Sequence, residues 1–196
     1  MSRPSAIVIG AGFTGCATAS DLALRGFDVT VLERGDIATG TSGRTHGLLH
    51  SGARYCVNDQ ESAIECIVES QILKRIAGQS IEYNGGMFIA IDESDLAYES
   101  AFVEGAQNCG IPIEKISPQK ALELEPNINP RLLSAYLVPD GTFDPLRLAL
   151  SFAANAKMHG ARFLLYCEVE GFIIDGRRNV TGVRYWNRGT GEHLEV

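Results

Sequence analysis

Residues 6–32 contain two apolar runs and a glycine-rich turn. Residues 6–9 form an apolar run rich in β-branched side chains, which favours a buried strand. After the turn, Ala19, Leu22 and Ala23 recur at helical spacing and give a helix one face small enough to lie flat on a sheet. Residues 28–32 then form a second apolar run. The pattern predicts a strand–helix–strand unit at the start of the chain.

The rest of the chain predicts further helices and short strands. Asn58 and Glu61 have the spacing of a capping box, which predicts a helix from there to about residue 78. Its apolar positions form a stripe that we assign to the core: Ile64, Ile67, Val68, Ile72 and Ile76. Helices are also expected over residues 94–108, 117–124 and 145–159, and strands over residues 87–91, 133–138, 162–166, 168–174, 180–186 and 193–196. We expect the strand over 162–166 to rejoin the first sheet in parallel, and the last three strands to form a β-meander.

Composition and charge narrow the class of protein. The 196 residues are 45% hydrophobic and 21% charged, which is ordinary for a soluble α/β enzyme. A formal net charge of -7 argues against a surface for nucleic acid or anionic membranes. No apolar run is long enough to span a bilayer, and we expect neither a leader nor a transmembrane segment. The five cysteines are scattered without a CxxC pair, so we expect reduced thiols in a cytosolic protein and no metal site.

A GxGxxG motif joins the first strand to the first helix through Gly10, Gly12 and Gly15. Glycine at these positions permits a tight turn, close approach of backbone N–H groups to a pyrophosphate, and close packing of the helix on the sheet. The helix N-terminus, with Phe13 and Thr14 in its first turn, then faces the phosphates with its partial positive charge. Because strand, turn, helix and second strand occur in register, the motif predicts dinucleotide binding.

Two features beyond this motif identify the dinucleotide. Glu33 stands about twenty residues beyond the glycines, where a carboxylate accepts hydrogen bonds from the adenosine ribose. Its charge disfavours NADP, although the neighbouring Arg34 weakens that argument. Residues 40–52 are a second glycine-rich, polar segment. A flavin needs such a segment, because its ribityl chain and ring system extend beyond the pyrophosphate. We therefore predict FAD rather than NAD.

Residues 46–55, HGLLHSGARY, resemble the D-amino-acid-oxidase superfamily of flavoproteins, and within it the FAD-dependent glycerol-3-phosphate dehydrogenases. The family of catalytic A subunits of the anaerobic enzyme is the most similar. The resemblance continues through ILKRIA at 72–77, NGGMFI at 84–89, PDGTFDP at 139–145 and Glu168-Val169, so it covers essentially the whole chain. It implies an α/β fold: a Rossmann-like FAD-binding domain with a parallel sheet and a β-meander, plus part of an inserted α+β substrate lobe.

The resemblance also implies a division into domains. Residues 1–83 and 141–196 would form a discontinuous FAD-binding domain, and residues 84–140 the first part of the substrate-binding lobe. Members of the family are much longer than this chain. The sequence therefore resembles an N-terminal fragment, whose missing part would supply a last sheet strand and the rest of the substrate lobe.

The implied reaction is oxidation of sn-glycerol 3-phosphate to dihydroxyacetone phosphate, with hydride transfer from C2 to flavin N5 and electrons passed to quinone. Arg54 matches a substrate-facing position, where its guanidinium would bind phosphate oxygens, with a structural ion pair as the alternative. Tyr55 would hydrogen-bond the substrate. His50 has a suitable intrinsic pKa for proton transfer and stands beside the expected flavin. It could serve as the base, as a donor to the flavin or as a loop-stabilising residue, and the base could equally lie in the missing part.

The resemblance assigns further flavin contacts to the glycine-rich segment and the first meander strand. These contacts are Thr41, Ser42, Thr45, His46, Gly47, Leu48, His50 and Val169. A turn role is the alternative for Thr41 and Ser42, and Val169 would meet adenine through its backbone. Some relatives link a histidine matching His46 covalently to the flavin, whereas the resembled subfamily binds FAD non-covalently. The loop departs from the subfamily at residues 43–45, where a bulky cation is present and a threonine replaces a common asparagine.

The resemblance implies partners as well: iron–sulfur and membrane-anchor subunits, with glycerol 3-phosphate as substrate and no nucleic acid. It implies a cytoplasmic protein, with peripheral attachment to the inner face of the cell membrane as a second expectation. Two other functions stay open. One is an oxidase or dehydrogenase of an L-2-hydroxy acid of the 2-hydroxyglutarate type, and the other is an inactive FAD-binding fragment. Arg54, Tyr55 and the helix over residues 61–77 favour the phosphate enzyme.

Overall fold

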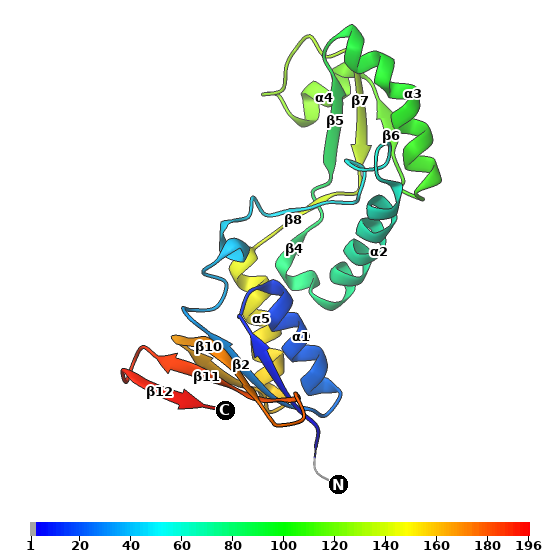
Figure 1. The fold of residues 1–196 in the computed structure, drawn as a ribbon. Helices are drawn as coiled ribbons and strands as arrows, with labels where there is room; N and C mark the ends of the chain where they lie inside the picture. The colour runs from blue at the N-terminus through cyan, green and yellow to red at the C-terminus, as the bar shows by residue number, and fades with distance from the viewer. Residues whose placement is uncertain (1–2) are drawn as a thin grey trace. The chain divides into compact units, whose positions relative to one another are not determined.

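A computed structural model describes residues 3–196, which form two compact units. The first unit comprises residues 3–46 and 144–196, and the second comprises residues 47–143. Each unit has its own sheets and its own hydrophobic core (Figure 1). The sequence predicted different boundaries, at residues 83 and 141, but those boundaries separate an FAD-binding domain from a substrate lobe and are not defined by compactness. That assignment therefore stays a prediction.

The first unit is built on a three-stranded parallel sheet in the order β1-β2-β9. These strands are β1 (Ser5–Ile9), β2 (Asp28–Glu33) and β9 (Arg162–Leu165). The register places Ser5 opposite Asp28 and Thr30 opposite Arg162. Strand β9 therefore returns from far along the sequence and rejoins the sheet in parallel, as predicted.

Helices α1 (Phe13–Leu24) and α5 (Pro145–Met158) pack side by side in the first unit (Figure 1). Ala19 and Ala23 of α1 are buried in the same cluster as Ala153 and Ala156 of α5. Their small side chains let the helices approach closely, and the Nδ2 of Asn155 donates a hydrogen bond to Ser20 Oγ across the contact at 2.8 Å. The predicted small face of the first helix is confirmed, but it packs against α5 as well as against the sheet, where Val29 and Val31 belong to the same cluster.

An antiparallel sheet completes the first unit. It consists of β10 (Cys167–Ile174), β11 (Val180–Asn187) and β12 (Glu192–Glu195), in that order. Leu32 of the parallel sheet is buried in one cluster with Cys167, Val183 and Tyr185 of this meander. The predicted meander is therefore confirmed, and the cluster packs it against the parallel sheet. A short 3₁₀ helix, η1 (Thr41–Arg44), follows β2.

The second unit contains two antiparallel sheets, in the orders β5-β7-β6 and β3-β8-β4. Its strands are β3 (Leu48–Leu49), β4 (Ile81–Glu82), β5 (Gly86–Ala90), β6 (Glu114–Ile116), β7 (Ser134–Val138) and β8 (Gly141–Phe143). Its helices are α2 (Gln60–Ile76), η2 (Gly78–Ser80), α3 (Glu93–Asn108) and α4 (Pro118–Leu124). Phe102 of α3 stacks on Phe88 with ring centroids 5.0 Å apart and meets Tyr136 edge-on at 5.7 Å. These aromatic contacts join α3 to its sheet.

The start of α2 differs from the capping box expected at Asn58. Asp59 is the N-cap, and its Oδ1 accepts a hydrogen bond from the Ser62 N–H at 3.1 Å. The Nδ2 of Asn58 instead donates to the hydroxyl of Tyr98 at 3.4 Å. Both residues can cap a helix, so the sequence alone did not separate two neighbouring candidates.

The sequence assigned an apolar stripe of α2 to the protein core. Only part of that stripe is buried, so the prediction was wrong. Ile67 is 6% exposed and belongs to the core of the second unit, whereas Ile64, Val68 and Ile76 are exposed. The buried face instead runs through Ala63, Ile67 and Ser70, which also recur at helical spacing. Ala63 and Ser70 have small side chains. A prediction of burial from hydrophobicity alone selects the larger apolar residues beside them.

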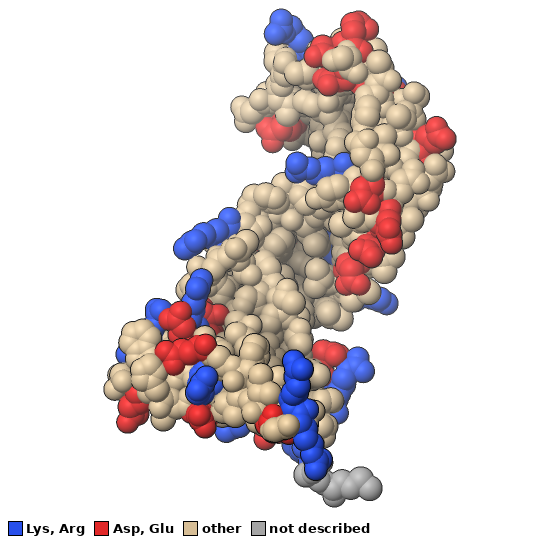
Figure 2. Space-filling view, viewed as in Figure 1, with Lys and Arg blue, Asp and Glu red and all other residues tan. Residues whose placement is uncertain are grey.

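Figure 2 shows Lys and Arg side chains interspersed with Asp and Glu on the visible face of the molecule. The exception on that face is a row of Asp and Glu side chains over α2, where Glu61, Glu65 and Glu69 are exposed at helical spacing. Within residues 3–196, no helix is both long enough and apolar enough to cross a bilayer.

Candidate functional site

The three glycines of the turn between β1 and α1 each solve a different steric problem. Gly10 has a φ of +98°, and its N–H donates to the carbonyl of Leu32 at 2.7 Å. A Cβ on Gly12 would lie 2.8 Å from Ser42 Oγ, and one on Gly15 would lie 2.0 Å from the carbonyl oxygen of Gly10. Gly10 is therefore required by its positive φ, a side chain at residue 12 would displace the Ser42 hydroxyl, and a side chain at residue 15 would clash with the backbone.

Helix α1 begins in a way that favours an anion. Gly12 is its N-cap and provides no side-chain hydrogen bond, and its first turn contains no acidic residue. The N–H of Phe13 donates to Ser42 Oγ at 3.0 Å, which ties η1 to the start of the helix. Thr14 and Gly15 follow in the first turn. A helix N-terminus without an acidic cap attracts phosphate through its N–H groups and its dipole.

Glu33 ends β2, and its carboxylate faces this turn. Its Oε2 accepts a hydrogen bond from the Ala11 N–H and its Oε1 accepts one from the Gly35 N–H, each at 2.8 Å. A carboxylate oxygen has two lone pairs, so both oxygens can still accept a ribose hydroxyl. Burial, and secondarily the charge of Glu33, raises the pKa of the nearby Cys16 thiol to about 11. Cys16 is therefore a neutral packing residue rather than a nucleophile.

A cavity of about 830 Å³ opens over these elements, entirely within the first unit. Its lining combines the glycine turn after β1, Glu33 at the end of β2, and the start of β10. Of the predicted cofactor residues it includes Gly10, Gly12, Glu33, Arg34, Thr41, Ser42 and Val169. Val169 lies beside a register shift in β10, where the strand departs from regular pairing. A glycine turn that excludes side chains, an electropositive helix end and a carboxylate at the end of β2 fit a dinucleotide.

The cavity also has lining residues that sequence reasoning missed. Arg188 lines it, forms an ion pair with Glu168, and places its guanidinium 5.5 Å from the centre of the Trp186 ring. Arg188 follows β11, far from the glycine motif in sequence. The sequence predicted that β10 pairs with β11, but it did not predict the register of that pairing, which brings Arg188 beside Glu168 on the cavity.

Four further predicted cofactor residues are not among those that line this cavity: Thr45, His46, Gly47 and Leu48. Thr45 and His46 end the first segment of the first unit, and Gly47 begins the second unit. Gly47 has a φ of +74°, and its carbonyl accepts a hydrogen bond from the Phe143 N–H at 2.8 Å. Leu48 belongs to β3, which pairs with β8. Their contacts with a flavin stay predictions.

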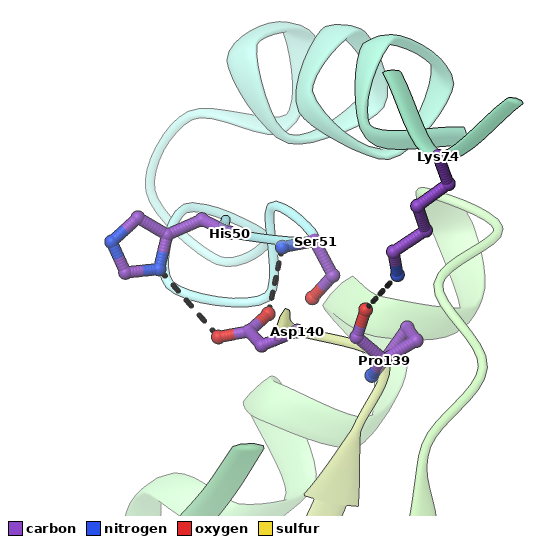
Figure 3. A network of polar contacts seen from close by, with 5 residues as sticks. All are labelled: His50, Ser51, Lys74, Pro139 and Asp140. Carbon is purple, nitrogen blue, oxygen red and sulfur yellow. Dashed lines mark hydrogen bonds and ion pairs between the residues drawn. The ribbon is translucent and has the colours of Figure 1, made fainter. Parts of the chain in front are cut away.

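A polar network follows β3 in the second unit (Figure 3). The Oδ1 of Asp140 accepts a hydrogen bond from the Ser51 N–H at 2.7 Å, and its Oδ2 lies 3.5 Å from His50 Nδ1. The Nζ of Lys74 donates to the carbonyl of Pro139 at 2.8 Å. These contacts join the loop after β3 and helix α2 to the segment between β7 and β8. Asp140 lies in a motif quoted for the family resemblance, but its pairing with His50 was not predicted.

Arg54 and Tyr55, the predicted substrate residues, are both exposed. They lie in a turn in which the Tyr55 N–H donates to the Gly52 carbonyl at 2.8 Å. Gly52 has a φ of +92°, and a Cβ there would lie 2.3 Å from the Ala63 carbonyl. Cys56, which follows, is fully buried in the core of the second unit, and burial raises the pKa of its thiol. Arg54 and Tyr55 are therefore exposed to solvent, whereas Cys56 is buried in the core.

Comparisons with known proteins agree with this geometry. Residues 5–195 match the family described as FAD dependent oxidoreductase, or DAO. The A subunit of the anaerobic glycerol-3-phosphate dehydrogenase of Escherichia coli (strain K12) is 52% identical over 186 residues, which are 95% of this chain and 34% of that protein. The chain thus spans about a third of the length of the curated relatives it matches.

Solved structures show the same fold. The crystal structure of L-proline dehydrogenase from P. horikoshii has a TM-score of 0.81 and 29% identity, covering 94% of this chain and 50% of that chain. The L-alpha-glycerophosphate oxidase from Mycoplasma pneumoniae, solved with FAD bound, has a TM-score of 0.79 over 96% of this chain and 50% of its own, with 19% identity. The predicted α/β fold and the predicted cofactor, FAD, are therefore confirmed. The chain belongs to the DAO family of FAD-dependent oxidoreductases.

Proposed function

We propose that the protein containing this chain oxidises sn-glycerol 3-phosphate to dihydroxyacetone phosphate. The observation that supports this most directly is the 52% identity, over 95% of the chain, to the A subunit of an anaerobic glycerol-3-phosphate dehydrogenase. Because the chain spans about a third of that relative, the activity is proposed for the whole protein. FAD, when bound, supplies the acceptor for a hydride from C2 of the substrate.

The cavity of the first unit is proposed to hold the dinucleotide part of FAD. The N-terminal end of α1, opened by Gly12, would bind the pyrophosphate, and Glu33 would accept hydrogen bonds from the adenosine ribose. Val169 would present its backbone to adenine from β10. Residues 45–48 would continue the contacts toward the flavin ring. This role agrees with a discontinuous FAD-binding domain over residues 1–83 and 141–196 and a substrate lobe that begins at residue 84.

Substrate binding is proposed for the exposed turn after β3. The guanidinium of Arg54 is exposed and presents a planar set of donors that matches phosphate oxygens. Tyr55 is exposed beside it and can donate a hydrogen bond to the glycerol part. His50 is proposed to accept the proton of the C2 hydroxyl, because an imidazole can change protonation near neutral pH.

Electron transfer beyond FAD is proposed to involve further subunits. The name of the Escherichia coli relative marks it as one lettered member of a larger assembly, which implies other subunits. We propose iron–sulfur and membrane-anchor partners that pass electrons to quinone, and a cytoplasmic protein held peripherally at the inner face of the cell membrane.

The test is an anaerobic titration of the full-length protein reconstituted with FAD. Glycerol 3-phosphate is expected to bleach the flavin absorbance at equivalents matching the FAD content, with dihydroxyacetone phosphate as product. L-2-Hydroxyglutarate is the comparison substrate. Bleaching by the hydroxy acid and not by glycerol 3-phosphate would reject the proposed substrate in favour of the hydroxy-acid alternative. Retained FAD that neither compound reduces would point to a binding protein without this activity.

A further inference from the structure

Asp140 is a mostly buried carboxylate of the second unit. It lies between β7 and β8, and its side chain is 13% exposed. Figure 3 shows its carboxylate directed at the loop that contains His50 and Ser51. Ser51 is 89 residues away in sequence. The contact is therefore created by the fold of the second unit rather than by local chain geometry.

The two carboxylate oxygens of Asp140 contact consecutive residues of that loop. Oδ1 accepts the Ser51 N–H at 2.7 Å, which is a strong charge-assisted hydrogen bond. Oδ2 lies 3.5 Å from the Nδ1 of His50, whose side chain is 26% exposed. That distance is long for a hydrogen bond and suits an electrostatic contact that shortens when the ring becomes positively charged. The backbone of the loop is thus fixed at one oxygen while the imidazole faces the other.

The surroundings hold Asp140 in place. The Nζ of Lys74 fixes the carbonyl of Pro139, the residue before it. A Cβ on Gly86 would lie 3.0 Å from the Cβ of Asp140 and 3.2 Å from its Oδ2, so glycine at residue 86 leaves the space that this carboxylate occupies. Asp140 and Lys74 are the charged side chains whose contacts define this network (Figure 3). The carboxylate is therefore built into the unit rather than swinging freely at its surface.

We propose that Asp140 is a positioning residue for His50. This inference rests on the proposed function, in which His50 accepts the substrate proton. The carboxylate would hold the ring as the Nδ1–H tautomer, so that the lone pair is on Nε2, the nitrogen farther from Asp140. As the C2–O–H bond breaks, the proton passes to Nε2, the electron pair forms the C2=O carbonyl, and the hydride leaves C2 for oxidised FAD. The Asp140 carboxylate stabilises the resulting imidazolium.

The test compares Asp140→Asn with His50→Ala and with the double variant, all in the full-length protein with FAD. The asparagine keeps the size of the side chain and can still accept the Ser51 N–H, but it lacks the negative charge. We expect kcat to fall roughly 10- to 100-fold with little change in KM, on the scale of general-base contributions. In the His50→Ala background the same substitution should change kcat less than about twofold, because Asp140 acts through that ring.

The pH profile distinguishes positioning from a purely structural role. The Asp140 carboxylate lies 3.5 Å from the ring and would stabilise the positive charge that develops on it during proton transfer, and asparagine removes that stabilisation. The pH dependence of kcat/KM should therefore differ between the wild type and Asp140→Asn. The ¹⁵N shifts of the His50 ring, assigned with His50→Gln, should report the Nδ1–H tautomer in the wild type and a changed tautomer balance in the variant. FAD retention should be unchanged.

Asp92→Asn is the matched control. Asp92 caps α3 in the same unit by accepting the N–H groups of Ser94 and Asp95, and asparagine is also a good cap. It should leave kcat and the pH profile unchanged. If His50→Ala keeps wild-type kcat, the proposed base is wrong and this inference fails with it. If His50→Ala is impaired while Asp140→Asn keeps both kcat and pH profile, or multiplies the loss in the double variant, only the role of Asp140 is overturned.

Discussion

The two units use opposite packing strategies. In the first unit, small residues such as Ala19, Ala153 and Gly15 bring α1 close to α5 and to the sheet. In the second unit, the core is joined by large rings, with Phe102 between Phe88 and Tyr136. The cavity of the first unit has many glycines and short side chains in its lining, which suits the close approach of a pyrophosphate that we propose for it. We therefore expect the first unit to tolerate added volume poorly and the second to tolerate lost volume poorly.

The largest expected effect is from Gly15→Val in the first unit. Its Cβ would lie 2.0 Å from the carbonyl oxygen of Gly10, a backbone atom that cannot rotate away. We expect at least about 3 kcal/mol of destabilisation, since overpacking against fixed atoms costs at least as much as overpacking a core. FAD retention after gel filtration should be lost, because the clash displaces the turn that we propose binds the pyrophosphate.

Gly176→Ala is the control for added volume. Gly176 lies in the meander of the same unit, and a Cβ there meets no atom within 4 Å. The control should retain FAD and change the free energy of unfolding by less than about 1 kcal/mol. Equal FAD retention in Gly15→Val and Gly176→Ala would contradict the close-packing explanation of the turn.

This comparison also explains which parts of the structure could be predicted. The turn through Gly10 and Gly15, the small face of α1 and the return of β9 all follow from local periodicity or from a connection rule, and the sequence predicted them. The contact between Asp140 and His50 joins distant segments of the chain, so no local pattern indicated it. Arg188 follows a strand of the predicted meander, but that prediction did not specify the strand register that places Arg188 beside Glu168. Motif recognition found the segment around Asp140 but not the residue's partner. Local pattern thus predicts the elements, and the polar network of the second unit requires the tertiary fold.

The second prediction removes volume from the second unit. Ile67→Ala deletes a side chain that is buried in the core beside Ala63. We expect about 2–3 kcal/mol of destabilisation from lost burial and the cavity left behind. Hydrogen–deuterium exchange of peptides covering α2 in the full-length protein measures this locally.

The neighbouring Val68 provides the matched control, because its side chain is 48% exposed on the same helix. Val68→Ala should change protection by less than about 0.5 kcal/mol. An equal loss of protection in both variants would mean that the apolar stripe is buried in the full-length protein, as the sequence first predicted.

The smallest expected effect concerns charge rather than volume in the second unit. Hydrogen bonds from Lys115 and then from Tyr136 lower the pKa of Glu99 from its usual 4.5 to about 2. The side chain is 20% exposed, so solvent screens part of this interaction, and we expect Glu99→Gln to cost about 1–2 kcal/mol at neutral pH. A carboxyl whose folded pKa is lowered stabilises the fold above its unfolded pKa. That contribution is lost as pH falls from about 4.5 towards 2.

The stability difference between wild type and Glu99→Gln should therefore be constant near neutral pH and shrink through that acidic window. Exchange of peptides covering α3, measured from pH 7 to pH 3, checks this. Glu104→Gln, an exposed carboxylate on the same helix, should show no such convergence. A Glu99→Gln difference that persists unchanged to pH 3 would mean that the side chain stabilises the unit by packing. The stability of the second unit would then come from the aromatic core around Phe102, without a contribution from the Lys115–Glu99 ion pair. The two units would then differ only in the volume of the side chains in their cores.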